Sequence, residues 1–369
     1  MTSLTTPIEI LRPQRIEFGC GLAALVGRWT EERGLSRILV VAGRSNAARV
    51  EQLGLKGEVT VFGEVKPEPD IPNLEAALAL AARVKPDLVI GFGGGSALDL
   101  AKLVAVLPGS GQSIHDVVGP EKVAGRRVAL VQVPTTAGTG SEAGMRALVT
   151  DPATQAKLAV QSRHMLADLA VIDPDLMLSV PPAMTAATGV DALAHCAEAF
   201  TSKRAHPLID LYALEGIRLV GRFLPRAVAD GTDREARAGL ALASLYGGYC
   251  LGPVNTTAGH AVAYPLGTRH HVAHGLACAV IFPHTLAFNA PAQPEKTALT
   301  LAALGVKDAD GAHGWCAALG IEMRLGQLGV PESDLPAMAR DAHAIRRLLD
   351  FNPRDISEAE ILAMYRRAF

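Results

Sequence analysis

The chain has 369 residues, of which 49% are apolar and 20% are charged, and its formal net charge at pH 7 is -2. This composition is typical of a compact globular protein and excludes a largely disordered one, while the length exceeds what a single core usually supports, so we expect two domains. Lys and Arg are scattered along the chain. The pattern therefore argues against a nucleic-acid or membrane surface and favours small-molecule partners.

The cysteines and the apolar runs restrict the cellular setting. The five cysteines are odd in number, widely spaced and lack any CxxC pair, so neither a disulfide framework nor a thiolate zinc site is expected. The N-terminal segment has no apolar run of signal-peptide length, and no stretch approaches the ~20 apolar residues of a membrane span. We therefore expect a cytoplasmic protein that does not enter the membrane.

The first half of the chain predicts a parallel sheet. From residue 37 to 150, β-branched runs alternate with Ala/Leu-rich segments of helical spacing, which is typical of an α/β domain with helices on both sheet faces. The predicted strands, and the helix between the middle two, are Ile38–Ala42, Glu58–Phe62, Asp87–Phe92, Val128–Val133 and Asn73–Val84.

The second half predicts a helical domain. After the Pro181-Pro182 pair, strand-like runs almost vanish, and Ala/Leu-rich segments dominate to the end of the chain. Breaks rich in Gly, Pro and Asn at 251–257 and 282–294 are expected to separate helices. We predict an α/β domain over residues 1–180 and an all-α domain over 181–369, with the boundary near Val180.

A glycine loop leads from a predicted buried strand directly into a predicted helix. It contains Gly94, Gly95 and Ser96. Glycines let the backbone approach a pyrophosphate, and the N–H groups at a helix start attract its negative charge, while the serine can cap the helix and donate to phosphate. The loop predicts a phosphate cradle, although not of the GxGxxG type. The alternative is a tight turn that binds nothing.

A second loop also follows a predicted strand, and it carries Thr135, Thr136 and Thr139 among glycines. Hydroxyl groups in such a loop can line a nucleotide groove. A polar turn held by hydrogen bonds from Ser and Thr to the backbone explains the same residues. Taken alone, the loop leaves both interpretations open.

A metal site is suggested by one carboxylate and three imidazoles. Asp191 and His195 stand four residues apart in one predicted helix, so their side chains project from one face and can meet at one ion. His260 and His274 follow on either side of a predicted turn at Pro265. This ligand set suits divalent iron or zinc and leaves room for a substrate oxygen. Each histidine alone is more often a surface or core residue, so spacing leaves the site open.

The two loops and the Asp/His/His/His set, occurring in this order, resemble the iron-containing (group III) alcohol dehydrogenase family of the dehydroquinate synthase-like superfamily. Further matching stretches cover nearly the whole chain and are Asp168–Pro174, Thr185–His195, Tyr264–Gly267, His274–Leu276 and Asn352–Arg354. The resemblance implies an α/β nucleotide domain, an all-helical metal domain and a deep cleft between them. It also implies a metal-dependent, NAD(P)-linked alcohol dehydrogenase or aldehyde reductase acting on a small alcohol or aldehyde.

The resemblance also assigns roles residue by residue. The metal ligands, for Fe²⁺ or Zn²⁺, would be Asp191, His195, His260 and His274. The cofactor contacts would be Gly94, Gly95 and Ser96 at the pyrophosphate, Thr135, Thr136 and Thr139 in the nucleotide loop, and Lys157 near the nicotinamide ribose. A homodimer or larger homo-oligomer is implied as well.

The segment after the first strand of the domain departs from many relatives. They have an aspartate that favours NAD by bonding the ribose hydroxyls, whereas this chain has Gly43, Arg44 and Ser45. No acid repels a 2′-phosphate here, and Arg44 and Ser45 are placed to receive one. We therefore predict that NADPH is accepted. The alternative is that Arg44 points to solvent.

The proton-transfer group is the second departure. Some relatives have a histidine four residues after the first downstream ligand, and this chain has Tyr264. A phenol with an ordinary pKa of ~10 can shape the pocket or hydrogen-bond the substrate, and His270 or His271 can transfer the proton instead. The sequence does not rank these three.

The main alternative function is that of a maleylacetate reductase, which shares this architecture and reduces a carbon–carbon double bond with less evident need of metal. The intact Asp/His/His/His set argues against it. Further alternatives are a zinc glycerol dehydrogenase, a carbon–oxygen lyase of the dehydroquinate synthase type, a transhydrogenase between hydroxy and oxo acids, and a catalytically silent nucleotide-binding protein. A lyase would leave nicotinamide absorbance unchanged, and a transhydrogenase would need no added cofactor.

Overall fold

The computed structural model describes residues 4–369, which pack into two units. The sheet unit comprises Leu11–Thr136 and Gly140–Leu178, and the helical unit comprises the residues up to Ile10, Ala137–Thr139 and Ser179–Phe369. One loop, at residues 137–139, therefore belongs to the helical unit although sheet-unit residues flank it on both sides. The domain boundary near Val180 stays a prediction of the sequence.

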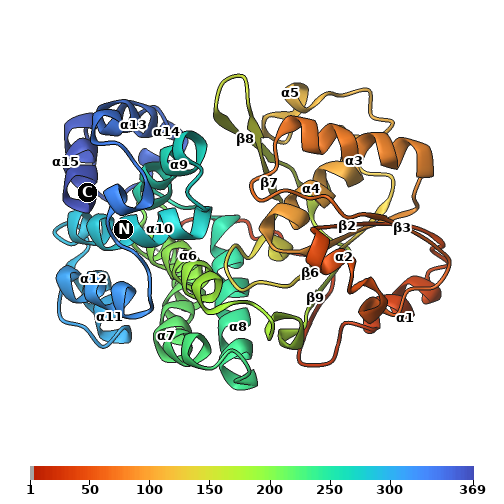
Figure 1. Ribbon diagram of the computed structural model, residues 1–369, viewed down its shortest axis with the longest axis horizontal. Helices are drawn as coiled ribbons and strands as arrows, with labels where there is room; N and C mark the ends of the chain where they lie inside the picture. The colour runs from red at the N-terminus through yellow and green to blue at the C-terminus, as the bar shows by residue number, and fades with distance from the viewer. Residues whose placement is uncertain (1–3) are drawn as a thin grey trace. The chain divides into compact units, whose positions relative to one another are not determined.

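The sheet unit is built on six parallel strands in the order β1-β9-β6-β4-β2-β3 (Figure 1). Their bounds are Ile16–Phe18 (β1), Arg37–Ala42 (β2), Glu58–Phe62 (β3), Leu88–Gly93 (β4), Ala129–Pro134 (β6) and Leu169–Ile172 (β9). The predicted parallel sheet is confirmed, and each of the four predicted strands is present within one residue of its expected bounds. The three- and four-residue strands β1 and β9 were not predicted.

Both faces of this sheet are covered, as the sequence predicts. The strand residues Leu39, Val41 and Val89 pack with α3 (Ile71–Val84) and α4 (Gly95–Val106) in one apolar cluster. Their neighbours along the strands, such as Ile38 and Ile90, pack with α1 (Leu25–Glu32) in another cluster (Figure 1). Because side chains alternate along a strand, a run of consecutive apolar residues is what a sheet buried on both faces requires.

A smaller, three-stranded sheet completes the unit. Its strands are β5 (Gly119–Pro120), β7 (Arg146–Asp151) and β8 (Ala156–Gln161), in the order β5-β8-β7. β7 and β8 form an antiparallel hairpin, which the sequence analysis did not predict. The short helices α2 (Arg44–Ala47) and α5 (Ile114–Val117) follow β2 and precede β5.

The helical unit is arranged around α6, whose residues from Gly189 to Thr201 are all buried. α6 packs on α7, α8 and α10, and a second apolar cluster joins α9, α10, α13 and α15. The bounds are Pro182–Thr201 (α6), Pro207–Ala229 (α7), Arg234–Leu251 (α8), Ala258–His270 (α9), His274–Asn289 (α10), Pro294–Ala303 (α11), Ala309–Ala318 (α12), Leu335–His343 (α13), Arg346–Leu349 (α14) and Glu358–Ala368 (α15).

The expected break at 251–257 is present between α8 and α9, and the break expected at 282–294 is confined to 290–293, because α10 continues through Pro283 to Asn289. The turn expected at Pro265 is wrong, because α9 continues through this proline. A proline in a helix removes one hydrogen bond, and both prolines here are buried in packed helices that tolerate the loss. The turn after α9 comes instead at His271, which has a left-handed backbone (φ 56°) and whose N–H donates to Gly267 O at 3.0 Å, the bond of an αL helix cap.

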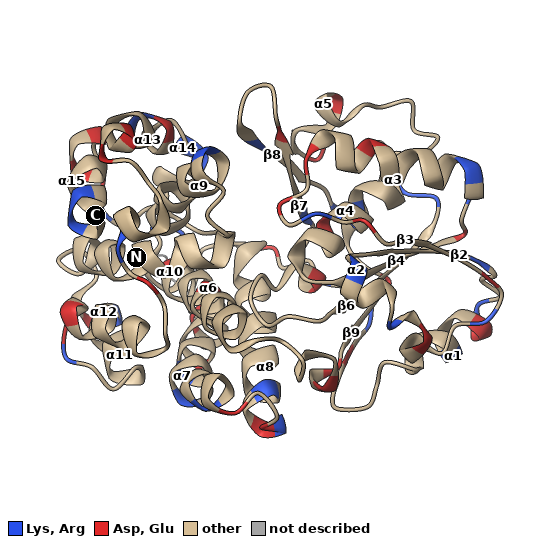
Figure 2. Cartoon of the chain, in the orientation of Figure 1, with Lys and Arg blue, Asp and Glu red and all other residues tan. Residues whose placement is uncertain are grey.

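Three features of the structure relate to the composition: the distribution of charge, the hydropathy of the helices and the state of the cysteines. Figure 2 shows Lys and Arg intermixed with Asp and Glu along both units, without a tract of one sign. Within residues 4–369, no helix is both long and apolar enough to cross a membrane. None of the five cysteines is in a disulfide bond; four of them are buried and Cys20 is exposed.

Lys102 connects α4 with the segment that precedes β7. Its side chain is 1% exposed, and Nζ donates to Ser141 O, Ser141 Oγ and Arg146 O at 2.7–2.8 Å. Asp99, one turn earlier on α4, accepts from Ser141 Oγ and from Leu148 N. The three protons of the ammonium group are therefore all used, which offsets the cost of burying its charge.

Replacement of Lys102 tests this connection. Lys102→Met keeps the length of the side chain but removes one donor from each of two part-buried carbonyl groups and the cation beside Asp99, so we expect a loss of about 3 kcal/mol in the stability of the sheet unit. The two tryptophans are Trp29 and Trp315. Urea unfolding followed by Trp29 fluorescence in a Trp315→Phe background reports on this unit alone. Lys56→Met, at an exposed ion pair, should change stability by less than about 0.5 kcal/mol; equal effects of the two substitutions would contradict the assignment.

Candidate metal centre and cofactor edge

α6 presents three polar side chains on one face of the helix. Asp191, His195 and Glu198 follow the spacing i, i+4 and i+7, so they lie on successive turns of the same side. All three are buried, with exposed fractions of 1%, 4% and 6%. A helix that buries two acids and a histidine on one face requires partners for them, and α9 and α10 provide these partners.

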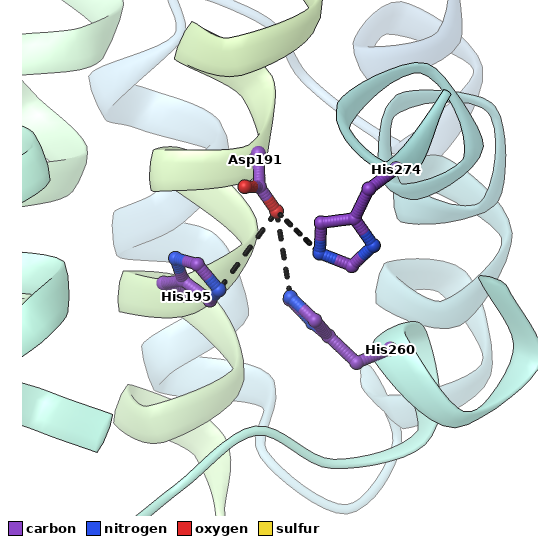
Figure 3. Close-up of side chains that lie close together, drawn as sticks. All are labelled: Asp191, His195, His260 and His274. Atoms are coloured by element: carbon purple, nitrogen blue, oxygen red, sulfur yellow. Dashed lines mark ion pairs between the residues drawn. The ribbon is translucent and has the colours of Figure 1, made fainter. Parts of the chain in front are cut away.

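Asp191, His195, His260 and His274 converge on one point (Figure 3). The distances from Asp191 Oδ1 to the Nε2 atoms of His195, His260 and His274 are 3.8, 3.4 and 3.6 Å. One potential ligand atom from each of the four side chains lies within 4.8 Å of all the others. Four N and O donors at these separations can surround a single divalent ion of the iron or zinc type.

Two atoms at the centre of this cluster lack hydrogen bonds. Asp191 Oδ1 and His260 Nε2 are buried and, although they lie 3.4 Å apart, neither has a hydrogen-bond partner in the described part of the chain. Buried polar atoms without a partner are costly and rare in proteins. A metal ion coordinated by both atoms would satisfy them, so the residues present fit a bound cation.

Glu198 is an outer partner that the sequence analysis missed. Its Oε1 lies 2.6 Å from His260 Nδ1, and its Oε2 accepts from the Thr257 and His260 N–H groups at 2.6 and 3.3 Å. The carboxylate thereby fixes the ring of His260 with Nε2 directed at Asp191, as outer partners of metal-ligating histidines do. Its position seven residues after Asp191 and three after His195 was the signal available in the sequence.

The pKa values of the four cluster residues are shifted in the directions expected for a site that attracts positive charge. Burial lowers the pKa of His195 to about 4, so this imidazole is neutral at pH 7 and able to ligate. Burial would raise the pKa of Asp191, but the neighbouring histidines outweigh it and hold this pKa below its ordinary value. For His260 and His274, burial would lower the pKa, but Cys278 and the nearby carboxylates outweigh it and raise it.

The predicted nucleotide residues of the sheet unit lie where parallel strands end. Gly43 follows β2, Gly94 follows β4 and Thr135 follows β6, and these three strands are neighbours in the sheet. A Cβ atom on Gly94 would lie 3.1 Å from Thr136 Oγ1, so the two loops approach as closely as glycine permits. Asn46, which the sequence analysis did not single out, donates to Thr135 Oγ1 at 3.1 Å. Ligands of open parallel sheets bind at this edge.

Ser96 and Lys157 are connected by a residue that sequence reasoning missed, Glu68. The Glu68 N–H donates to Ser96 Oγ at 3.2 Å, and its carboxylate accepts from Lys157 Nζ at 2.6 Å. Glu68 has a left-handed backbone, with φ 50°, which is unusual for a residue with a side chain and is often found at functional sites. The structure therefore brings Lys157 to the glycine loop that contains Gly95 and Ser96, whereas Thr139 belongs to the helical unit.

The three candidate proton-transfer residues have different surroundings. Tyr264 is 6% exposed, and its ring centre lies 6.3 Å from that of His260 and 5.9 Å from that of His274. His270 has its Nε2 atom 3.5 Å from Asp334 Oδ2. His271 is exposed and forms the left-handed turn after α9. Of the three, only Tyr264 has a ring contact with the four-residue cluster.

Comparison with known proteins matches both parts of the chain. Residues 13–174 match the family model "Iron-containing alcohol dehydrogenase", and residues 185–369 match the model "Fe-containing alcohol dehydrogenase family, C-terminal". The two matches together cover most of the chain. The first includes the glycine loop, and the second includes the four-residue cluster.

Individual relatives are similar over most of their length. The chain is 39% identical over 326 residues to "Long-chain-alcohol dehydrogenase 1" of Geobacillus thermodenitrificans, covering 84% of this chain and 82% of that one. It is similar to a crystal structure of 1,3-propanediol oxidoreductase, with a TM-score of 0.92, 33% identity and coverage of 99% and 100%. A maleylacetate reductase from Agrobacterium tumefaciens has a TM-score of 0.84, 28% identity and coverage of 99% of both chains.

Gly259 offers a test of the Glu198 contact. A Cβ atom at this position would lie 2.5 Å from Glu198 Oε1, so Gly259→Ala should displace the carboxylate that orients His260 while favouring the helix itself. We expect affinity for Zn²⁺ to fall about 10- to 100-fold, the usual cost of losing an outer partner, measured by competition with a chromophoric chelator. Gly252→Ala is the matched control, because a Cβ atom there meets no atom within 4 Å. Unchanged affinity in Gly259→Ala would rule out this role of Glu198.

Proposed function

The chain belongs to the iron-containing alcohol dehydrogenase family, and we propose that it interconverts a small alcohol and its aldehyde, with a nicotinamide dinucleotide as the hydride carrier. It is an oxidoreductase acting on CH–OH groups, in a family that uses NAD and a metal ion. The observation that carries the proposal is the buried cluster of one carboxylate and three imidazoles, in which two central atoms have no hydrogen-bond partner.

Different residues have different proposed roles in the reaction. Asp191, His195, His260 and His274 would hold the metal ion. When bound, the ion supplies Lewis acidity at the substrate oxygen, and the nicotinamide exchanges the hydride. Glu198 keeps the ring of His260 oriented through the 2.6 Å contact with Nδ1. Tyr264, beside His260 and His274, is the side chain we propose to hydrogen-bond the substrate and to exchange its proton with solvent.

The cofactor residues are proposed to act through the backbone as well as through side chains. Gly94, Gly95 and Ser96 would bind the pyrophosphate at the start of α4, where N–H groups point out of the helix. Thr135 and Thr136 would contact the nucleotide from the neighbouring loop, followed by Thr139. Lys157, held by Glu68, would bind near the nicotinamide ribose.

Cofactor preference is proposed from the segment after β2. The residue after β2 is Gly43 and not an acid, and Arg44 is exposed, with no ion pair to any other residue described. A guanidinium group that is not neutralised by a neighbouring acid favours a 2′-phosphate. We therefore propose that NADPH is used in addition to NADH.

The alternative function is that of a maleylacetate reductase, since a structure of that enzyme is similar over the whole chain. The intact metal cluster favours the alcohol dehydrogenase. The deciding experiment follows NADH and NADPH absorbance with a panel of small aldehydes and with maleylacetate, before and after chelation and after add-back of Fe²⁺ or Zn²⁺. Aldehyde reduction restored by metal supports the proposal, and chelator-resistant turnover of maleylacetate alone overturns it.

Three points stay predictions of the sequence: the choice between iron and zinc, the assembly into a homodimer or larger oligomer, and the cytoplasmic location. Zinc usually outcompetes ferrous iron for such ligands, so occupancy depends on supply. Metal analysis of the protein as purified and gel filtration address the first two.

His260→Ala tests the metal assignment against a matched change. Loss of one ligand should abolish turnover and metal retention but leave NADH binding, measured by nicotinamide fluorescence, within about twofold, because the proposed nucleotide contacts lie elsewhere in the chain. His313→Ala, whose ring contacts His284 outside the cluster, should keep activity and metal. A fully active His260→Ala enzyme would refute the assignment.

Arg44→Ala tests the proposed use of NADPH. We expect kcat/KM for NADPH to fall about 10-fold or more, which corresponds to about 1.4 kcal/mol, because a charged hydrogen bond to the 2′-phosphate is lost. The value for NADH should change by less than about twofold. Arg28→Ala, another exposed arginine of the sheet unit, should change neither. Parallel losses with both cofactors would show that Arg44 does not recognise the phosphate.

A further inference from the structure

A cavity lies at the amino end of the parallel sheet, within the sheet unit. Its volume is about 370 Å³, inside the range of roughly 300–1,000 Å³ that is usual for ligand sites. Ala129, the first residue of β6, lines it, whereas the proposed nucleotide contact Thr135 follows the last residue of this strand. A strand of six residues spans about 20 Å, so the cavity is separate from the nucleotide edge. The polar side chains that line it are Gln14, Trp29, Arg33, Arg126, Arg127 and Asp168.

The acid in this lining is already fully engaged. Asp168 accepts from the two terminal nitrogens of Arg126 at 2.7 and 2.8 Å, and from Gln14 Nε2 at 3.1 Å. It also accepts from the Leu130 N–H at 2.8 Å. These contacts occupy both carboxylate oxygens, and the paired geometry with Arg126 neutralises one guanidinium group. Asp168 is therefore not available to the two remaining arginines.

Those two arginines and the tryptophan are donors that lack strong acceptors. Arg127 is exposed and has no ion pair in the described part of the chain. The Arg33 guanidinium lies 4.2 Å from the centre of the Trp29 ring, and its ion pair is with the exposed Glu32 at 3.9 Å. Trp29 is 2% exposed, and its Nε1–H, which can only donate, has no hydrogen-bond partner among the described residues. Three arginines and one aspartate give the lining a net charge of +2.

We propose that this cavity binds the phosphate group of a small molecule. Two guanidinium groups that are not neutralised by a strong partner match a dianion, and planar guanidinium groups are preferred donors to phosphate. Arg33 follows α1 and Arg127 precedes β6, so the two donors come from separate segments. The cavity is larger than a phosphate ion and has room for a small organic group. The site depends neither on the metal centre nor on the proposed reaction.

Trp29 is the reporter in the test. Its fluorescence is measured in the full-length protein with Trp315→Phe, during titration with inorganic phosphate and, in a second arm, with glycerol 3-phosphate, at constant ionic strength. We expect a saturable change, and Arg127→Ala should weaken binding about 10-fold because a charged hydrogen bond is lost. Arg83→Ala, at an exposed arginine of α3 outside the cavity, is the matched control and should leave the affinity unchanged.

The two arms distinguish the possible sources of the phosphate group. Tighter binding of the ester supports the site with an organic phosphate as its ligand, and equal or weaker binding of the ester supports it with the free ion. Absence of saturable binding in both arms, or equal affinity of the parent and Arg127→Ala, overturns the proposal.

Two competitors test selectivity and location. Malonate carries two carboxylates, so equal affinity for malonate would show that the cavity selects charge alone and would overturn the assignment to phosphate. Excess NAD⁺ should leave phosphate affinity unchanged, because the proposed nucleotide residues lie at the other edge of the sheet. Displacement of phosphate by NAD⁺ would place the ion at the nucleotide edge and refute the separate site.

Discussion

The Asp191 carboxylate lies in the interior of the helical unit, with three imidazole nitrogens within 3.8 Å of one of its oxygens. Removing such a charge from water costs several kcal/mol unless charge and hydrogen bonds compensate. Much of the helical unit provides the groups that compensate this charge. α6 carries the carboxylate and His195, α9 carries His260 against Glu198, and α10 begins at His274. The prolines inside α9 and α10 are tolerated because these helices are fixed by packing.

The proposed role of the sheet unit sets a different problem, which is to present backbone N–H groups to an anion. A parallel sheet buried on both faces leaves its strand ends as the place where polar loops can gather. β2, β4 and β6 are neighbours, and Asn46 after β2 donates to Thr135 after β6. Glu68, after β3, donates from its N–H to Ser96 at the glycine loop. Lys102, fully hydrogen-bonded, joins the helix of the glycine loop to the segment that follows the threonine loop.

The sequence predicted those elements whose signal is local. The buried strands are runs of consecutive apolar residues, and the Asp191/His195 pair lies within one helix, so periodicity identifies both. β1 and β9 are three and four residues long and depend on pairing with each other, far apart in the sequence. Likewise, Glu198 acquires its role only through contacts with Thr257 and His260, which are about 60 residues away in the sequence. Pro265 suggested a turn because a single sequence shows the helix-breaking tendency of proline but not the packing that overcomes it. The convergence of His260 and His274 on α6 came from the family resemblance, since their spacing alone did not require it.

The loop after β6 has contacts with residues of both proposed sites. It begins at Thr135, whose N–H donates to Gly93 O in the glycine loop at 2.9 Å. Three residues later, the Gly138 N–H donates to Ser244 Oγ at 2.9 Å, and the Gly138 carbonyl oxygen lies 3.3 Å from His195 Nδ1. The acceptor that orients one proposed ligand is therefore only three residues from a proposed nucleotide contact. One short loop therefore contributes both to the proposed nucleotide edge and to the contact that orients a proposed metal ligand.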